Sequence, residues 1–229
     1  MNLRQKTGSE LSFSRLLIYY GALFAVWVAC TFFLFPAADS LAGNKWIFAL
    51  IHGAVKTAVW ALPFVLLIKK YERDMLFTLK GMFVKWERRL LFLPVFLVII
   101  AYYLIGAYIS FGEISVHADF DPANIIGTVL VAGIVEELVF RGFFLNALMK
   151  MMSREKAAVV TALMFLAIHF PLWIMQGVFL NPLSALQACA GIALLSLLFS
   201  LMFVYSKNIV VPALAHMLWN FLAVFFFGR

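Results

Sequence analysis

Residues 123–149 decide the fold, and they read ANIIGTVLVAGIVEELVFRGFFLNALM. The stretch is long and apolar enough to cross a bilayer as a helix, which takes about 20 residues. Three charged residues, Glu136, Glu137 and Arg141, lie near its middle. A charge at the bilayer centre costs about 2.5–3.5 kcal/mol on insertion scales, so these side chains should face other helices rather than lipid. The stretch therefore predicts a membrane helix inside a bundle with a polar interior.

The rest of the chain has the composition of a membrane protein. Of its 229 residues, 65% are hydrophobic and 13% are charged, whereas soluble domains have about 45–50% and about 25%. Barrel strands would alternate in hydrophobicity, so the apolar runs are expected to be helices. The predicted fold is all-α, a polytopic transmembrane helical bundle of about seven spans (six to eight possible), with residues 1–229 in a single domain. The expected spans are Leu16–Phe35, Trp46–Ile68, Leu90–Ile109, Ala123–Met149, Ala157–Gln176, Leu183–Tyr205 and Ile209–Phe227.

The first run and the two cysteines have ordinary interpretations. Pro36-Ala37-Ala38 could pass for a cleavage site, but the run is longer than the 7–15 apolar residues of a signal-peptide core. An uncleaved first span is expected. Cys30 and Cys189 fall inside apolar runs, where they form neither a disulfide framework nor a metal-binding spacing. They are expected to be small packing residues.

The net charge of +7 does not indicate nucleic acid, because the positive residues lie next to the span ends, where lipid headgroups explain them. Lys and Arg residues are concentrated in the N-terminal segment, residues 69–89, residues 150–156 and position 207. The opposite loops hold only Lys45 and Arg229, and loop 110–122 is acidic. This asymmetry predicts a cytoplasmic N-terminus and an outside C-terminus, in the plasma membrane of a bacterium. Residues 69–89 should meet anionic headgroups.

Residues 75–86 have the periodicity of an amphipathic helix. Their apolar positions follow helical spacing, and Lys80, Lys85 and Arg89 lie on other faces. This pattern favours a surface helix in the cytoplasmic headgroup layer over a plain structured loop. The apolar positions are Met75, Leu79, Met82, Phe83 and Trp86.

The spacing of polar residues inside the spans groups them into two pairs. Glu137 and Arg141 are four residues apart and share a helix face, so they can form an ion pair. Glu136 points about 100° away, since a helix has about 3.6 residues per turn. His216 and Asn220 are also four residues apart and should point to one spot.

Three spans bring these groups to similar depth. At about 1.5 Å per residue, Glu136 lies about 20 Å, His169 about 18 Å, His216 about 10 Å and Asn220 about 16 Å from the cytoplasmic side. A buried Glu–Arg pair can be purely structural, and a single buried His can satisfy a backbone carbonyl. The convergence of all these groups favours a functional site.

His52 and Lys56 in the second span are four residues apart as well. A structural or cavity-lining role is the favoured interpretation for them. Ser196 and Ser200 are the serines nearest in depth to the site, but no base lies at a suitable spacing, and mid-helix serines usually bond to their own helix.

The polar motifs resemble those of the CAAX protease and bacteriocin-processing (CPBP, or abortive-infection) family of intramembrane glutamic endopeptidases. The resemblance lies in residues 123–227, and its motifs are Glu136-Glu137-x-x-x-Arg141, Phe165-x-x-x-His169 and His216-x-x-x-Asn220. All three occur in order and on separate predicted spans. The first three spans carry no motif.

The resemblance implies a catalytic set of Glu136, Glu137, Arg141, His169, His216 and Asn220. In this set Glu136 would be the catalytic glutamate and His169 its partner in activating water. His216 and Asn220 would stabilise the oxyanion, and Glu137 and Arg141 would complete the first motif. Elementary chemistry agrees, because a carboxylate can act as a general base and an Asn amide can donate to a developing negative oxygen.

The sequence thus predicts a hydrolase: a membrane endopeptidase that acts without cofactor or metal on a membrane-associated protein or peptide. One alternative is a zinc protease with Glu136, His169 and His216 as ligands, since three such ligands plus water make an acceptable zinc site. The absence of a His-Glu-x-x-His pair disfavours it. The other alternative is a non-enzymatic membrane protein that binds peptides, confers immunity or serves as a scaffold.

Overall fold

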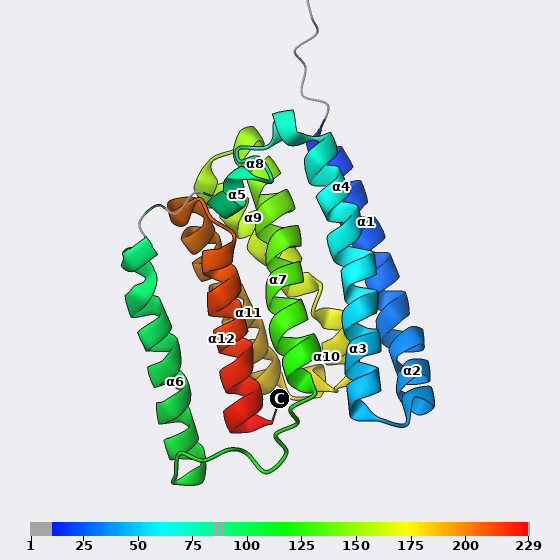
Figure 1. Ribbon diagram of the computed structural model, residues 1–229, viewed down its shortest axis with the longest axis vertical. Helices are drawn as coiled ribbons and strands as arrows, with labels where there is room; N and C mark the ends of the chain where they lie inside the picture. Colours follow the sequence, from blue (N-terminus) through cyan, green and yellow to red (C-terminus); the bar gives the residue numbers. More distant parts are fainter. Residues whose placement is uncertain (1–10, 85–86, 88, 229) are drawn as a thin grey trace, which may run out of the picture.

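The apolar runs fold into long helices that stand side by side, as the ribbon of the computed structural model shows (Figure 1). The structure describes residues 11–84, 87 and 89–228. Within this part of the chain every regular element is helical, which confirms the all-α prediction. Several of the long runs contain a π-helical segment.

The N-terminal half forms three long runs. Their elements, in chain order, are α1 (Phe13–Ala29), η1 (Cys30–Leu34) and α2 (Phe35–Ala42); α3 (Lys45–Lys56), η2 (Thr57–Ala61) and α4 (Leu62–Lys70); and η4 (Arg89–Phe92) with α6 (Leu93–Phe111). Two short elements, η3 (Glu72–Asp74) and α5 (Gly81–Val84), lie between the second and third runs.

The C-terminal half contains the four remaining runs. They are η5 (Ile125–Val131), α7 (Ala132–Glu137), η6 (Leu138–Leu145) and α8 (Asn146–Met151); α9 (Arg154–Ala167) and α10 (Phe170–Met175); α11 (Pro182–Ser206); and α12 (Val210–Phe227). The 3-10 turn η7 (Val178–Leu180) precedes α11. The last two runs are separate helices, and the chain turns between them at Lys207, whose backbone φ is 55°.

Six helices of the described chain are long and apolar enough to cross a membrane. They are Phe13–Ala42, Lys45–Lys70, Leu90–Phe111, Arg154–Met175, Pro182–Ser206 and Val210–Phe227. The remaining run, from η5 to α8, is also long, but it carries Glu136, Glu137 and Arg141. It lies within the bundle between the others (Figure 1). The arrangement agrees with about seven spans.

The run from η5 to α8 occupies the core. Every residue from Val135 to Leu148 is buried, as expected for a helix that is apolar on all sides apart from a few paired charges. Its aromatic residues Phe140, Phe143 and Phe144 belong to a core cluster that extends to α1, α4 and α9. A second cluster joins α6, α11 and α12. The polar residues of the central run are therefore enclosed by neighbouring helices.

The structure contradicts the surface helix expected over residues 75–86. Its described part holds only the four-residue helix α5, and Met75 and Met82 are buried in the main core. Asn146 fixes this loop: its Oδ1 accepts from the Phe77 N–H, and its Nδ2 donates to the Phe77 carbonyl, both at 2.8 Å. At Met75 and Met82 the apolar periodicity of the loop reflects packing against the bundle, whereas Phe83 is exposed. Lys85, Trp86 and Arg88 lie outside the described residues.

The fifth predicted span is interrupted. Helix α9 ends at Ala167, and α10 starts at Phe170 with Pro171 in its first turn. Proline has no N–H to donate, and its ring disfavours helical conformation in the preceding residue. The break places His169 between two helices.

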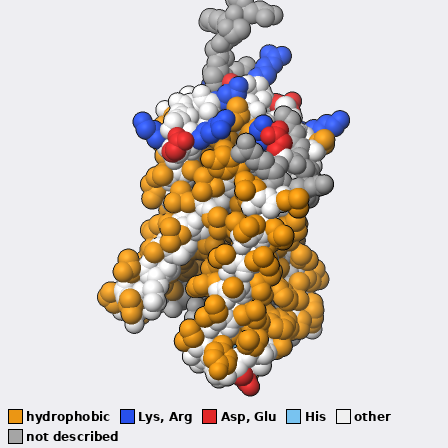
Figure 2. Space-filling view, turned by 90° about the vertical axis from the view of Figure 1, so that its left-hand side faces the viewer, with side chains coloured by type: hydrophobic (Ala, Val, Ile, Leu, Met, Phe, Trp, Pro, Cys, Tyr) orange, Lys and Arg blue, Asp and Glu red, His pale blue; other side chains and the backbone are white. Residues whose placement is uncertain are grey.

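Positive side chains gather at one end of the molecule, above a band of hydrophobic side chains (Figure 2). The loop after α4, the α8–α9 turn and the α11–α12 turn lie at this end (Figure 1). At the opposite end, Lys45 forms an ion pair with Asp121 at 3.2 Å. The positive residues Arg4, Lys6 and Arg229 lie outside the described part. Cys30 is buried and Cys189 half-buried, and both are free thiols.

Candidate active site

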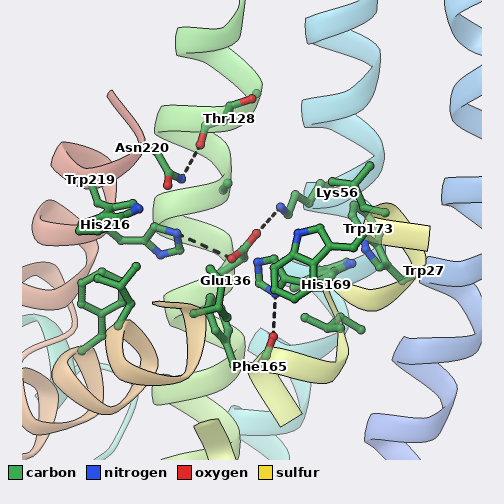
Figure 3. A pocket seen from close by; sticks show the side chains of 18 of the residues that line it. Trp27, Lys56, Thr128, Glu136, Phe165, His169, Trp173, His216, Trp219 and Asn220 are labelled. Atoms are coloured by element: carbon green, nitrogen blue, oxygen red, sulfur yellow. Dashed lines mark hydrogen bonds and ion pairs between the residues drawn. The ribbon is translucent and has the colours of Figure 1, made fainter. Parts of the chain in front are cut away.

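Glu136, on α7, forms an ion pair with a residue that the motifs do not include. The Nζ of Lys56, from the end of α3, lies 2.5 Å from Glu136 Oε1 (Figure 3). Both side chains are buried, with residue exposures of 5% for Lys56 and 6% for Glu136. The other carboxylate oxygen, Oε2, is 3.8 Å from His216 Nε2. Glu136 therefore has one oxygen engaged and one directed towards a histidine.

Glu137 is the acceptor in a second, fully buried network. Its Oε1 accepts from Arg141 at 2.9 Å and from His216 Nδ1 at 2.8 Å. Arg141 also donates to the carbonyl and hydroxyl oxygens of Ser196 on α11, and its guanidinium lies 4.7 Å from the Phe165 ring centroid. This network links three helices and explains why the i, i+4 pair predicted from the sequence tolerates burial.

His169 is oriented by the helix break. Its Nδ1 is 2.7 Å from the Phe165 carbonyl at the end of α9. A carbonyl can only accept, so Nδ1 carries the proton, and Nε2 of the neutral ring is left as an acceptor. The Phe165 ring, four residues before His169, and the Trp173 ring, four residues after it, both lie against the imidazole.

His216 and Asn220 lie one turn apart on α12, as their spacing predicts. The His216 ring stacks on Phe199 of α11, with centroids 5.1 Å apart. The Asn220 Nδ2 donates to the Thr128 carbonyl of η5 at 2.8 Å. That bond uses one of its two N–H groups and fixes the direction of the other.

These residues meet in one cavity of about 390 Å³. Four predicted catalytic residues, Glu136, His169, His216 and Asn220, line it, together with Lys56 (Figure 3). Its other walls are mostly aromatic and aliphatic, and they consist of Trp27, His52, Trp60, Gly127, Thr128, Ala132, Phe165, Ile168, Leu172, Trp173, Ile192, Leu195, Phe199 and Trp219. The cavity thus combines a cluster of polar side chains with mostly apolar walls.

Glu137 and Arg141 have a different place from the other four predicted residues. Both have an exposure of 0% and neither lines the cavity. They touch residues that line it: Glu137 binds His216, and Arg141 lies against the Phe165 ring. Ser200 bonds back to the Ser196 carbonyl at 2.8 Å, in agreement with its predicted role within its own helix. His52 and Lys56 do line the cavity, as expected.

The sequence reasoning missed the pairing of Lys56 with Glu136. The signal was present, because a lysine in the middle of an apolar run needs a partner. The two residues are 80 positions apart, however, and spacing within one helix does not identify the facing helix.

The donors of the alternative zinc site are already engaged with other groups. Glu136, His169 and His216 share the cavity, but Glu136 Oε1 faces the Lys56 ammonium and His216 Nδ1 faces Glu137. Within the part of the chain that the structure describes, no group of three His, Cys, Asp or Glu side chains is arranged to hold a metal ion. The residues present do not fit the zinc site that the sequence left open.

The comparison with protein families gives one match. Residues 119–222 match the family described as Type II CAAX prenyl endopeptidase Rce1-like. The comparison with curated proteins gives no match, and the comparison with solved structures gives none either. The match covers the part of the chain that carries all three motifs.

Fold and family together define the class of protein. Several membrane-spanning helices surround a site with the motif residues of a protease family. Residues 119–222 match an Rce1-like domain, as the resemblance of the motifs to the CAAX protease (CPBP) family predicts. In general terms the match supports a multi-pass membrane protease with a membrane-associated substrate.

Proposed function

We propose that this protein is a glutamic intramembrane endopeptidase that uses Glu136 and His169 to activate water. One observation carries the proposal: Glu136, His169, His216 and Asn220, which come from three separate helical runs, line the same cavity. Polar groups of this kind are costly at membrane depth. Their meeting at one cavity fits a reaction better than a purely structural role.

The attacking water would be held by Glu136 Oε2 and His169 Nε2. Lys56 binds Oε1, Oε2 lies 3.8 Å from His216 Nε2, and the Phe165 carbonyl leaves His169 Nε2 as an acceptor. As the water oxygen bonds to the peptide carbonyl carbon, its proton passes to Glu136, and the carbonyl electron pair moves to the oxygen. When the C–N bond breaks, Glu136 returns that proton to the leaving nitrogen. Each step uses a positioned general acid or base.

The oxyanion would be stabilised by α12. The second N–H of Asn220 is free to donate because the first is held by the Thr128 carbonyl. His216 Nδ1 lies 2.8 Å from the Glu137 carboxylate, to which it can donate, and in the imidazolium form the Nε2–H of the same ring would donate to the oxyanion. Preorganised donors of this kind contribute about 10²–10³ in rate each.

The substrate proposed is a hydrophobic peptide segment of a membrane-associated protein. The apolar, tryptophan-rich walls of the cavity suit such a segment. The matching family is named for CAAX prenyl endopeptidases, so a prenylated C-terminal peptide is one form that this substrate can take.

A cleavage assay of the purified protein in lipid nanodiscs tests the proposal. The probes are an internally quenched peptide with a farnesylated CAAX end and the same peptide without the prenyl group. We expect cleavage of at least one probe, and we expect it to survive exhaustive chelation because the proposed base and donors are all side chains of this chain. Failure to cleave both probes contradicts the proposal, and activity lost on chelation and restored by Zn²⁺ would favour the zinc alternative.

A further inference from the structure

The strongest feature that the three motifs leave unexplained is Lys56. It lies on α3, outside residues 119–222 that match the family. Its ammonium contacts the one cavity carboxylate to which the proposed function assigns the chemistry. Ion pairs with buried carboxylates are strong because little water screens them.

The environment of Lys56 holds its ammonium in place. The Nζ lies 5.3 Å from the Trp27 ring centroid and 5.1 Å from the Trp60 ring centroid. Trp27 comes from α1 and Trp60 from η2, and the two rings contact each other edge-to-face with centroids 4.8 Å apart. Cation–π contacts of this kind stabilise an ammonium that is removed from water. The aromatic pair therefore directs the lysine towards α7.

Charge balance assigns each buried cation to one carboxylate. Arg141 pairs with Glu137 at 2.9 Å, and Lys56 pairs with Glu136. The other titratable groups facing Glu136 are His216 from α12, and His169 and His52, which line the same cavity. Without Lys56, Glu136 would be left with the imidazoles and with Arg141, whose guanidinium is already paired with Glu137.

We propose that Lys56 is a positioning residue for the reaction. It binds Glu136 Oε1, and so keeps the Glu136 carboxylate ionised and its Oε2 directed at the position of the attacking water. This inference rests on the proposed function. It also gives the N-terminal spans a role, because Lys56, Trp27 and Trp60 all come from them. Lys56 does not contact the reacting atoms; it acts through Glu136.

The test is an infrared titration of the protein in nanodiscs, which needs no substrate. The band of the protonated Glu136 carboxyl is identified as the band that Glu136→Gln removes. In Lys56→Met this band should persist to a pH about 1–3 units higher than in the wild type, since a neighbouring opposite charge shifts a carboxyl by that amount. Lys56→Arg keeps the charge and should titrate as the wild type does.

Controls separate this role from a structural one. Lys45→Met removes a lysine from the exposed pair with Asp121 and should leave the band unchanged. Lys56→Gln serves as a second uncharged variant if Lys56→Met does not fold. In the cleavage assay, the uncharged variants should have a lower kcat with little change in KM. The acid limb of their pH–rate profile should move in the same direction as the infrared band.

Two outcomes would refute different claims. If Glu136 titrates at the same pH in the uncharged variants as in the wild type, or if Lys56→Arg shifts as far as Lys56→Met, the role of Lys56 is wrong. If instead Glu136→Gln cleaves the probes at the wild-type rate, the proposed function itself fails.

Discussion

At the residue scale, the two buried ion pairs differ: the Glu137–Arg141 pair is enclosed by the bundle, whereas the Lys56–Glu136 pair lines the cavity. Glu137 and Arg141 have no exposure and bind Ser196 and His216. Glu136 and Lys56 reach the cavity. A closed pair can position its neighbours, whereas only a pair at the cavity can meet a substrate.

The enclosed Glu137–Arg141 pair leads to a stability prediction. Arg141→Ala leaves Glu137 as a buried charge without its arginine, and breaking a buried pair in this way costs about 3–5 kcal/mol. We expect a large drop in thermal stability in detergent. Arg154→Ala, at an exposed position in the first turn of α9, is the matched control and should change little. Equal stability of the two variants would show that the Glu137–Arg141 pair does not support the fold.

The sequence predicted much of the site at this scale. Spacing of four residues correctly placed Glu137 with Arg141 and put His216 and Asn220 on one side of α12. It did not give the Asn220 bond to Thr128, or the Lys56 bond to Glu136, because both join residues far apart in sequence. Such contacts depend on which helices are neighbours, and a single sequence does not encode that in its spacing.

At the element scale, the site depends on how closely α12 approaches the central run. A Cβ added at Gly133 of α7 would collide with the Met217 side chain, and would lie 3.2 Å from the Met217 backbone nitrogen. Met217 directly follows His216. The glycine thus allows the approach that brings His216 to Glu137 and Glu136.

Gly133→Ala is therefore expected to lower cleavage activity. The added methyl group pushes α12 away from α7 and lengthens the His216–Glu137 contact, and misplacement of a catalytic group by about 1 Å can cost about 10²-fold in rate. Gly191→Ala in α11, where a Cβ meets nothing within 4 Å, is the control and should keep activity. Wild-type activity in Gly133→Ala would contradict this account of the α7–α12 contact.

Two elements differ from their sequence prediction for physical reasons. The break at His169 follows from Pro171, a helix-breaking residue inside an apolar run that is long enough for a single span. The loop at residues 75–84 copies the periodicity of a surface helix, yet its methionines pack into the core and Asn146 pairs with the Phe77 backbone. Periodicity identifies apolar positions but not whether lipid or protein covers them.

At the scale of the whole molecule, the charge asymmetry sets the expected orientation. The positive loops lie at one end of the bundle (Figure 2), and positive loops are retained on the cytoplasmic side. We propose that this end faces the cytoplasm of the plasma membrane. Anionic headgroups would then meet the loop between α4 and α6.

Reporter fusions test this orientation. A reporter within residues 71–80 should report the cytoplasm, and one within residues 112–122 should report the opposite side. The two loops lie at opposite ends of the bundle (Figure 1), so both reporters on the same side would contradict the topology. An inverted result would leave the bundle intact but refute the assignment of the positive end.

The first two runs also contribute to the site, although the family match covers only residues 119–222. The first two runs supply Trp27, Lys56 and Trp60 to the cavity wall. No sequence motif marks these positions, because each is a single polar or aromatic residue within an apolar run. Their role becomes visible only once the helices are packed.

The most direct test of the central claim is the cleavage assay with Glu136→Gln in nanodiscs. The substitution keeps the shape of the side chain and its hydrogen bonding but removes the basic carboxylate. Glu155→Gln, at an exposed position of α9, is the control. We predict that Glu136→Gln still folds, because its amide oxygen can accept from Lys56, and that it cleaves neither probe, while Glu155→Gln cleaves normally. A folded Glu136→Gln that cleaves at the wild-type rate would contradict catalysis by this glutamate and favour a peptide-binding or scaffolding protein.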